Sequence, residues 1–143
     1  MKKRSLRVVL DTNVWVSAMI WGGPPADILR AAEEGRITVI ISEEIVEEIA
    51  RTLLYHRLSE IYQGAGISRE ELIETVLRIG KLVKVDIRLD VIRDDSSDNR
   101  VLECAVESNA DYIVSGDEHV LKMKRYRKTE IVSTRQFAKL LPA

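Results

Sequence analysis

Three aspartates lie where the apolar pattern of the chain changes. Asp11 directly follows the β-branched run Arg7–Leu10, Asp117 comes shortly after the similar run Tyr112–Val114, and Asp98 begins a helical pattern. In an open parallel sheet, the carboxyl ends of the strands and the N-termini of the following helices meet at one edge, where ligands collect. We therefore expect the three carboxylates to lie at the same edge. Capping of a helix would explain Asp11 alone, but not the recurrence.

Clustered carboxylates need a positive charge among them. Two carboxylates about 4 Å apart repel by roughly 4 kcal/mol at an effective dielectric constant of about 20. The motifs around these acids place no lysine or arginine between them, whereas a hard divalent cation prefers carboxylate oxygens and water as ligands. The sequence therefore favours Mg²⁺ or Mn²⁺. A softer metal is disfavoured, because the chain has one cysteine, Cys104, and two separated histidines, His56 and His119.

Two of the expected acids, Asp98 and a glutamate, lie on helices. Asp98 begins an apolar stripe that continues at i+3, i+4 and i+7, through Val101, Leu102 and Ala105, so we expect its side chain on the buried side of the helix. The earlier helix Ser42–Leu54 offers four glutamates that fit a solvated face: Glu43, Glu44, Glu47 and Glu48. Periodicity alone does not select one of them.

Short β-rich runs alternate with helical patterns along the whole chain. The expected strands are Arg7–Leu10, Thr38–Ile41, Leu82–Val85, Tyr112–Val114 and Glu130–Val132. The expected helices are Ala26–Glu34, Ser42–Leu54, Ser68–Gly80, Ser97–Ser108 and Thr134–Leu141. This alternation predicts an α/β fold with a central parallel sheet covered by helices on both faces.

Length and charge bound the class of protein. The 143 residues are expected to form a single domain, residues 1–143, that is stable without disulfides. Twenty-two basic and twenty-three acidic residues give a net charge of −1, so any nucleic-acid binding must come from a local patch.

The start of the chain has a superficial likeness to a signal peptide, with basic residues ahead of an apolar stretch. Arg7, Asp11 and Asn13 interrupt that stretch. No other run approaches the roughly 20 apolar residues of a membrane span, and a single cysteine fits a reducing compartment. We therefore expect a soluble cytoplasmic protein that does not associate with membranes.

Four motifs, in their order and spacing, resemble the PIN-domain family. They are Val9–Asn13, Ser42 followed by Glu48 and Ile49, Asp94–Ala105, and Ala110–Asp117. The likeness covers Arg7 to Leu141 and is greatest to the prokaryotic branch of VapC-like ribonucleases, which are toxin components of toxin–antitoxin systems. It implies a three-layer α/β/α sandwich with a Rossmann-like parallel sheet.

The resemblance also implies a ribonuclease site that uses one or two Mg²⁺ or Mn²⁺ ions. Carried over by position, the metal-binding and catalytic acids are Asp11, Glu48, Asp98 and Asp117, so the likeness selects Glu48 from the four glutamates. Thr12, Asn13 and Ser115 match polar positions that orient carboxylates and metal-bound water. Ser96 and Ser97 depart from the pattern, because relatives often carry further acids there. Metal-assisted hydrolysis would leave 5′-phosphate and 3′-hydroxyl ends.

Substrate RNA would be bound by the most basic segment of the chain. Its cations flank Tyr126, whose ring can stack on a base, and are Lys122, Lys124, Arg125, Arg127 and Lys128. The alternative is that this run is simply solvated. Arg4, Arg7 and Arg100 are secondary candidates.

Other functions and partners stay open at this point. The apolar group Trp15, Met19, Ile20 and Trp21 is either core or a subunit interface, and the family likeness favours a homodimer and a separate antitoxin chain. One rival is a PIN-fold module that binds RNA or protein without catalysis. Another is a phosphatase of the haloacid dehalogenase type, which needs a second aspartate two residues after Asp11, where this chain has Asn13.

Overall fold

The computed structural model describes residues 5–92 and 96–142 of the protein. Within these ranges, the strands form a six-stranded sheet in the order β3-β2-β1-β4-β6-β5. The strands are β1 Leu6–Leu10, β2 Ile37–Ser42, β3 Lys81–Val83, β4 Tyr112–Val114, β5 Arg125–Tyr126 and β6 Thr129–Val132. Neighbouring strands are parallel, except that β5 pairs antiparallel with β6. The prediction of a parallel sheet is therefore right except at this edge.

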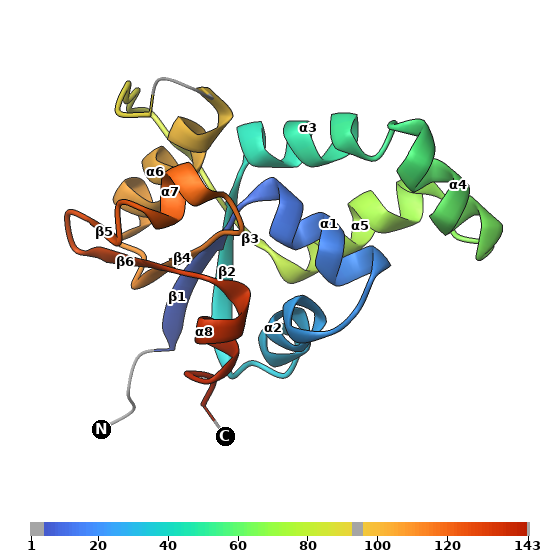
Figure 1. Cartoon of the computed structure of the whole chain (residues 1–143), viewed down its shortest axis with the longest axis horizontal. Helices are drawn as coiled ribbons and strands as arrows, with labels where there is room; N and C mark the ends of the chain where they lie inside the picture. Colours follow the sequence, from blue (N-terminus) through green and yellow to red (C-terminus); the bar gives the residue numbers. More distant parts are fainter. Residues whose placement is uncertain (1–4, 93–95, 143) are drawn as a thin grey trace.

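Helices cover both faces of the sheet (Figure 1). They are α1 Thr12–Ile20, α2 Pro24–Glu33, α3 Glu43–Thr52, α4 His56–Gly64, α5 Arg69–Ile79, α6 Ser96–Ser108, α7 Glu118–Leu121 and α8 Thr134–Ala138. Because parallel crossovers are right-handed, the steps from β1 to β3 place α1 and α2 on one face, and the return from β3 to β4 places α6 on the other. α6 packs against β1, β2, β3 and β4, and α8 packs on α2. The predicted α/β/α sandwich is confirmed.

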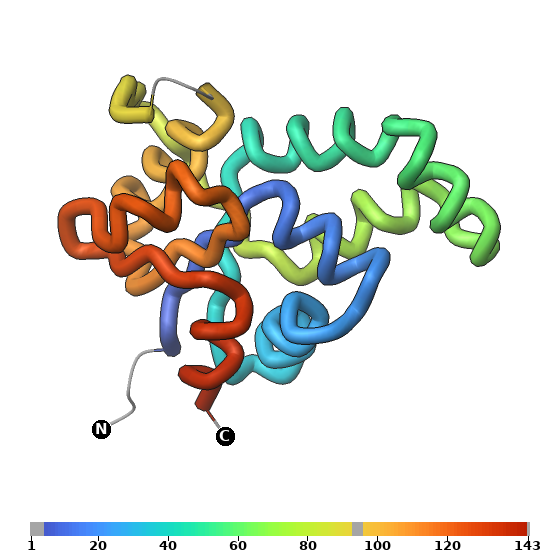
Figure 2. Tube along the Cα trace, viewed as in Figure 1, coloured from blue at the N-terminus to red at the C-terminus, as the bar shows by residue number. Residues whose placement is uncertain are grey.

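The helices α3, α4 and α5 form an arm that extends beyond the sheet (Figure 2). The arm reverses at Gly66, whose positive φ of 78° suits glycine at the end of a helix. Gly66 N–H donates to the Gln63 carbonyl and Ile67 N–H to the Tyr62 carbonyl, both at 2.9 Å, which is the Schellman pattern. No helix within the described part of the chain is both long and apolar enough to span a bilayer.

Side-chain caps fix where several helices begin. Asp11 caps α1, and the Ser42 hydroxyl accepts from Ile45 N–H to cap α3. Ser68 and Ser133 form capping boxes with the glutamate and glutamine three residues on. These caps satisfy backbone N–H groups that the helix itself leaves unpaired, and they place each helix start within two residues of the sequence-based expectation where one was made.

Three helices and one strand were missed by the sequence patterns. α1 is apolar on most of its surface, so it has no polar face to give a helical period, and the short elements α7 and β5 have four and two residues. α4 was missed because it has one buried side chain, Tyr62, and therefore no buried stripe with a helical period. The last helix ends at Ala138, three residues before the expected Leu141, because the chain turns where Leu140 N–H donates to the Phe137 carbonyl.

Gly80 lets α5 pass close to the sheet. It ends α5 directly before β3, and a Cβ added there would lie 2.8 Å from the Ile41 Cγ2 atom of β2 and 3.1 Å from the Val76 carbonyl oxygen. Ile41 is fully buried, so it has little room to move.

We expect Gly80→Ala to lower the free energy of unfolding by about 1–3 kcal/mol through overpacking. Gly64→Ala is the matched control, because Gly64 lies in α4 and a Cβ there meets nothing within 4 Å; alanine should stabilise that helix by roughly 0.5–1 kcal/mol. Urea denaturation of both variants measures the difference. Equal midpoints for the two variants would show that the close approach at Gly80 does not affect the free energy of unfolding.

Candidate active site

Asp11 stands at the carboxyl end of β1 and begins α1. Its backbone N–H donates to the Val114 carbonyl at the end of β4, 3.1 Å away, which extends the pairing of the two strands. Its Oδ1 atom accepts from the backbone N–H of Val14 at 2.9 Å and caps α1. Capping is thus one role of Asp11, and it uses one of the two carboxylate oxygens.

The second oxygen of Asp11 binds the segment that follows β4. Oδ2 accepts from the Ser115 hydroxyl at 2.5 Å and from the Gly116 N–H at 3.4 Å. The same hydroxyl accepts from the backbone N–H of Asp117 at 3.0 Å. The carboxylate of Asp117 in turn accepts from His119 N–H at 2.7 Å and begins α7. Ser115 is fully buried, so it fixes the two aspartates relative to each other.

The four acids singled out from the sequence line one small cavity of about 40 Å³: Asp11, Glu48, Asp98 and Asp117. They come from the ends of β1 and β4 and from the helices α3 and α6, and the cavity is completed by Thr12, Asn13, Ser97 and Val101. A water molecule occupies roughly 30 Å³ in the liquid. The cavity therefore has room for an ion with water.

The first turn of α6, which carries Asp98, is held by a strap, residues 85–92, that lies along the helix. Asp98 is 7% exposed, and its neighbour Asn99 is 2% exposed. The Asn99 side chain accepts from the backbone N–H groups of Val91 and Ile92 at 3.0 and 2.8 Å, and it donates to the Ile92 carbonyl at 2.6 Å. This clamp ties the chain that leads toward Asp98 to the first turn of the helix.

One turn later, the buried Glu103 repeats the clamp. Its carboxylate accepts from Leu89 N–H at 2.7 Å and pairs with Arg88 at 2.9 Å and with Arg100 at 2.8 Å. Sequence reasoning missed both clamp residues, although Asn99 and Glu103 stand four residues apart among apolar neighbours, which is the available signal. Arg100, a secondary candidate for RNA binding, lies in α6 and donates to the Leu89 carbonyl of the strap at 3.4 Å.

Burial makes the charge on Asp11 unfavourable. Asp11 is 6% exposed, and desolvation raises the pKa of its carboxyl above 3.8. The hydrogen bonds from Ser115, Val14 and Gly116 oppose this rise, and the negative charge of Asp117 adds to it. A cation in the cavity would favour the ionised form.

The residues around the cavity fit a hard cation. The titratable side chains that line it are all carboxylates, which suit Mg²⁺ or Mn²⁺. Thr12 Oγ1 is buried there without a hydrogen-bond partner among the described residues, and a cation or its water would satisfy it. Across residues 5–92 and 96–142, no three acidic, histidine or cysteine side chains are gathered closely enough to hold an ion as they stand.

The basic segment is divided between the two ends of the sheet. Lys122 and Lys124 precede β5 and lie toward the end where the acids are, since Ile131 N–H near the end of β6 donates to the Lys124 carbonyl. Arg127 and Lys128 form the β5–β6 turn and therefore lie where β6 begins, at the opposite end.

Several other basic candidates have structural contacts. Arg125 pairs with Glu130 at 3.1 Å, and Arg127 lies over the Tyr126 ring, 5.4 Å from its centre. Arg7 Nε donates to the Ser108 carbonyl at 2.9 Å. Arg4 lies outside the described residues. Of the apolar group after Asn13, Trp15 is fully buried, whereas Trp21 is 62% exposed.

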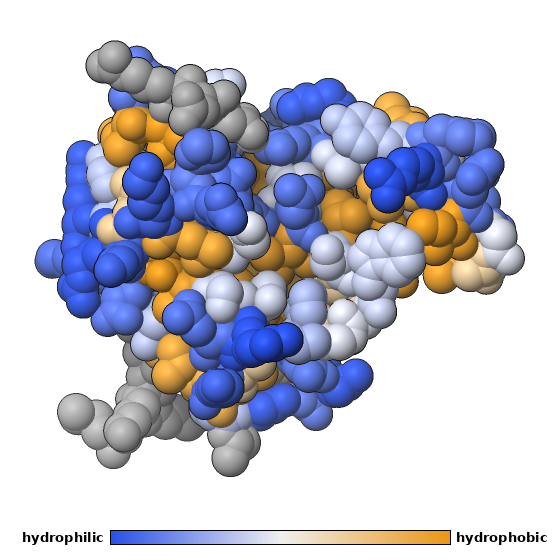
Figure 3. All heavy atoms as spheres, in the orientation of Figure 1, coloured by the Kyte–Doolittle hydropathy of each residue, from blue (hydrophilic) through white to orange (hydrophobic). Residues whose placement is uncertain are grey.

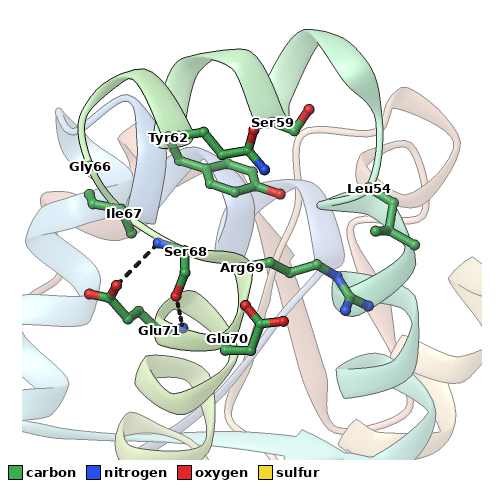
Figure 4. A pocket seen from close by; sticks show the side chains of 10 residues that line it. Leu54, Ser59, Tyr62, Gly66, Ile67, Ser68, Arg69, Glu70 and Glu71 are labelled. Carbon is green, nitrogen blue, oxygen red and sulfur yellow. Dashed lines mark hydrogen bonds between the residues drawn. The ribbon is translucent and has the colours of Figure 1, made fainter.

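A far larger cavity, of about 550 Å³, lies between α4 and α5 (Figure 4). Its polar groups serve the arm itself: Ser68 and Glu71 form the capping box of α5, and Arg69 Nε donates to the Ala50 carbonyl of α3. Size alone does not mark this cavity as the active site, because its lining does not bring together a cluster of carboxylates like that of the four acids.

Comparison with known proteins agrees with this architecture. The PIN-domain model matches residues 7–119. An uncharacterized protein of Methanocaldococcus jannaschii is 30% identical over 129 residues, which are 90% of this chain and 81% of that protein. The chain is also similar in fold to a chain in the crystal structure of VapBC2 from Rickettsia felis bound to a DNA fragment from their promoter. That match has a TM-score of 0.62, 14% identity, and covers 90% of this chain and 98% of the other.

The raised pKa of Asp11 predicts how stability depends on pH without metal. Its contribution is fully present below the unfolded value of 3.8 and is lost as the pH rises through the higher folded-state pKa. In EDTA, the free energy of unfolding of the wild type should therefore fall relative to that of Asp11→Asn as the pH rises from 3.8 toward neutral. Urea denaturation along a pH series measures this. A difference that is constant with pH would contradict the burial argument.

Proposed function

The chain belongs to the PIN-domain family, and we propose that it is a Mg²⁺- or Mn²⁺-dependent endoribonuclease that cleaves at the acidic cavity. PIN-domain proteins are typically nucleases that use divalent metal ions. One observation carries the proposal: Asp11, Glu48, Asp98 and Asp117, from four separate segments, line a single cavity. We also propose that residues 1–143 form a single PIN-like domain.

The four acids would hold one or two ions, directly or through water. When bound, Mg²⁺ or Mn²⁺ supplies activation of water and neutralisation of the charge that develops at phosphorus. The Ser115 hydroxyl and the Val14 N–H keep both oxygens of Asp11 oriented, and the strap on Asn99 keeps the start of α6 in place. Asn13, which is exposed and lines the cavity, would orient carboxylates and metal-bound water. Hydrolysis would leave 5′-phosphate and 3′-hydroxyl ends.

The surroundings of the cavity support RNA as the substrate. Lys122 and Lys124 stand on the acid side of the sheet and would bind RNA phosphates there. We further propose that the protein is the toxin of a toxin–antitoxin pair, acts in the cytoplasm as a homodimer, and pairs with a separate antitoxin chain. The fold similarity to a chain of VapBC2 supports the antitoxin partner.

Cleavage of single-stranded RNA in Mg²⁺, Mn²⁺ or EDTA tests the proposal. We expect metal-dependent cleavage that falls about 100-fold or more in Asp11→Asn, Asp98→Asn and Glu48→Gln, because loss of supporting side chains alone costs roughly 10–100-fold at metal sites. Glu47→Gln is the matched control, since Glu47 is exposed on the same helix, outside the cavity.

The product ends and the metal dependence decide the outcome. Cleavage that persists in EDTA, cyclic phosphate ends, or equal loss in the Glu47 and Glu48 variants would each contradict the metal-acid mechanism. If the purified protein binds RNA but cleaves none under any of the three conditions, the non-catalytic binding module is the better description.

Thermal unfolding gives a readout of the cation that does not depend on activity. A ligand at one hundred times its Kd adds about 2.7 kcal/mol to stability when it binds only the folded state. We expect Mg²⁺ or Mn²⁺ to raise the Tm of the wild type at neutral pH, and to raise that of Asp11→Asn much less. Equal shifts in both proteins would exclude a cation at Asp11.

A further inference from the structure

A second cavity lies at the other end of the sheet from the acids. It has a volume of about 180 Å³ and is lined by Ala105, Val106, Asn109, Arg127, Lys128 and Thr129. This is the end where β6 begins, and the Thr129 hydroxyl donates there to the Ala110 carbonyl just ahead of β4, at 2.8 Å. The acidic cavity lies at the carboxyl ends of β1 and β4, which is the other end of the sheet. The two cavities are therefore separate.

The cavity combines an apolar floor with a basic rim. Ala105 is buried in α6, whereas Asn109, Arg127 and Lys128 are exposed. Asn109 and Arg127 both have left-handed backbones, with φ of 53° and 54°, which end α6 and tighten the β5–β6 turn. These two turns bring an amide and two cations around one apolar surface.

The acids next to the rim residues in the sequence have contacts elsewhere. Glu130 pairs with Arg125 at 3.1 Å, the Glu107 carboxylate accepts from a strap N–H at 3.4 Å, and the Asp111 carboxylate accepts from a β1 N–H at 2.8 Å. In the part of the chain that the structure describes, neither Arg127 nor Lys128 forms an ion pair. The rim thus carries positive charge toward solvent, although the whole chain has a net charge of −1.

We propose that this second cavity binds one nucleotide of the RNA strand that is cleaved at the acidic cavity. Arg127 and Lys128 would bind its phosphate, its base would lie against Ala105 and Val106, and the Asn109 amide would contact the base edge. This inference rests on the proposed function and adds a length requirement: the substrate is a single strand that reaches several nucleotides from the scissile bond.

The surface between the two cavities suits such a strand. Lys122 and Lys124 come before β5, and Arg127 and Lys128 come after it, so exposed cations stand at both ends of this outermost strand. In Figure 3, hydrophilic side chains lie along the left edge of the molecule, where Figure 1 places β5. The four steps from Ala110 to Val114 advance by about 13 Å at 3.3 Å per residue, a span that an extended ligand covers.

Binding to labelled single-stranded RNA of about sixteen nucleotides, the upper end of common single-strand site sizes, tests the cavity. In EDTA, the double variant Arg127→Ala/Lys128→Ala should bind about tenfold more weakly. The slope of log K against log salt should fall by roughly 0.7, because the two side chains share one phosphate and each phosphate contact on a single strand contributes about 0.7. Lys81→Ala/Lys139→Ala removes the same charge from exposed sites on β3 and after α8 and is the control.

A second variant tests the contact with the base separately from the contact with the phosphate. Asn109→Gly removes the amide but keeps a residue that adopts a positive φ without strain. It should weaken binding of the same RNA and leave the salt slope unchanged. In Mg²⁺, the basic double variant should raise KM for the long RNA about tenfold with kcat unchanged, and should leave KM unchanged for an RNA of about four nucleotides.

The outcomes separate this proposal from the nuclease proposal. An unchanged affinity and salt slope in the basic double variant, or an equal loss in the lysine control, would overturn the second cavity even if Asp11-dependent cleavage is found. The predicted change of slope without cleavage in any metal would uphold the cavity as a nucleotide site and overturn the nuclease.

Discussion

The acidic end of the sheet is built around a carboxylate buried at the ends of two parallel strands. A buried charge must be solvated by protein groups or by a cation, and Asp11 receives one hydrogen bond from the start of α1 and two from the segment after β4. Neither segment can shift without removing part of that solvation. Because Asp117 binds the same Ser115 hydroxyl, the spacing of two acids is set by the pairing of β1 with β4, and not by flexible loops.

The acids could be predicted because parallel strands end at a common edge. The register that pairs Leu10 with Val114 brings Asp11 beside the residues after β4, as alternation of strands and helices implies. Glu48 could not be selected by period, since four glutamates fit the same helix surface, and the family resemblance alone selected it. In the structure, Glu48 lines the cavity and Glu47 is exposed, a distinction that depends on how α3 packs against α1 and α6.

The remaining features depend on contacts between distant segments. The clamp of Asn99 and Glu103 on the strap needs an extended chain beside α6, and the strap itself has no regular hydrogen-bond pattern to predict. The sequence pattern did not predict α1, because a helix that is buried on most sides has no polar face to reveal a helical period. The basic run reads as one patch in the sequence, yet a two-residue strand and a tight turn carry its members to opposite ends of the sheet.

The short outer strands of the sheet limit how copies of the protein can associate. Long, flat edge strands invite other chains to add to a sheet, whereas brief and charged ones resist it. Here one edge is β3, three residues that begin with Lys81, and the other is β5, formed by Arg125 and Tyr126. Extension of the sheet from molecule to molecule is thereby disfavoured at both edges. Self-association would then use other surfaces, such as the turns beside the helices that expose Trp21, Leu54 and Tyr55.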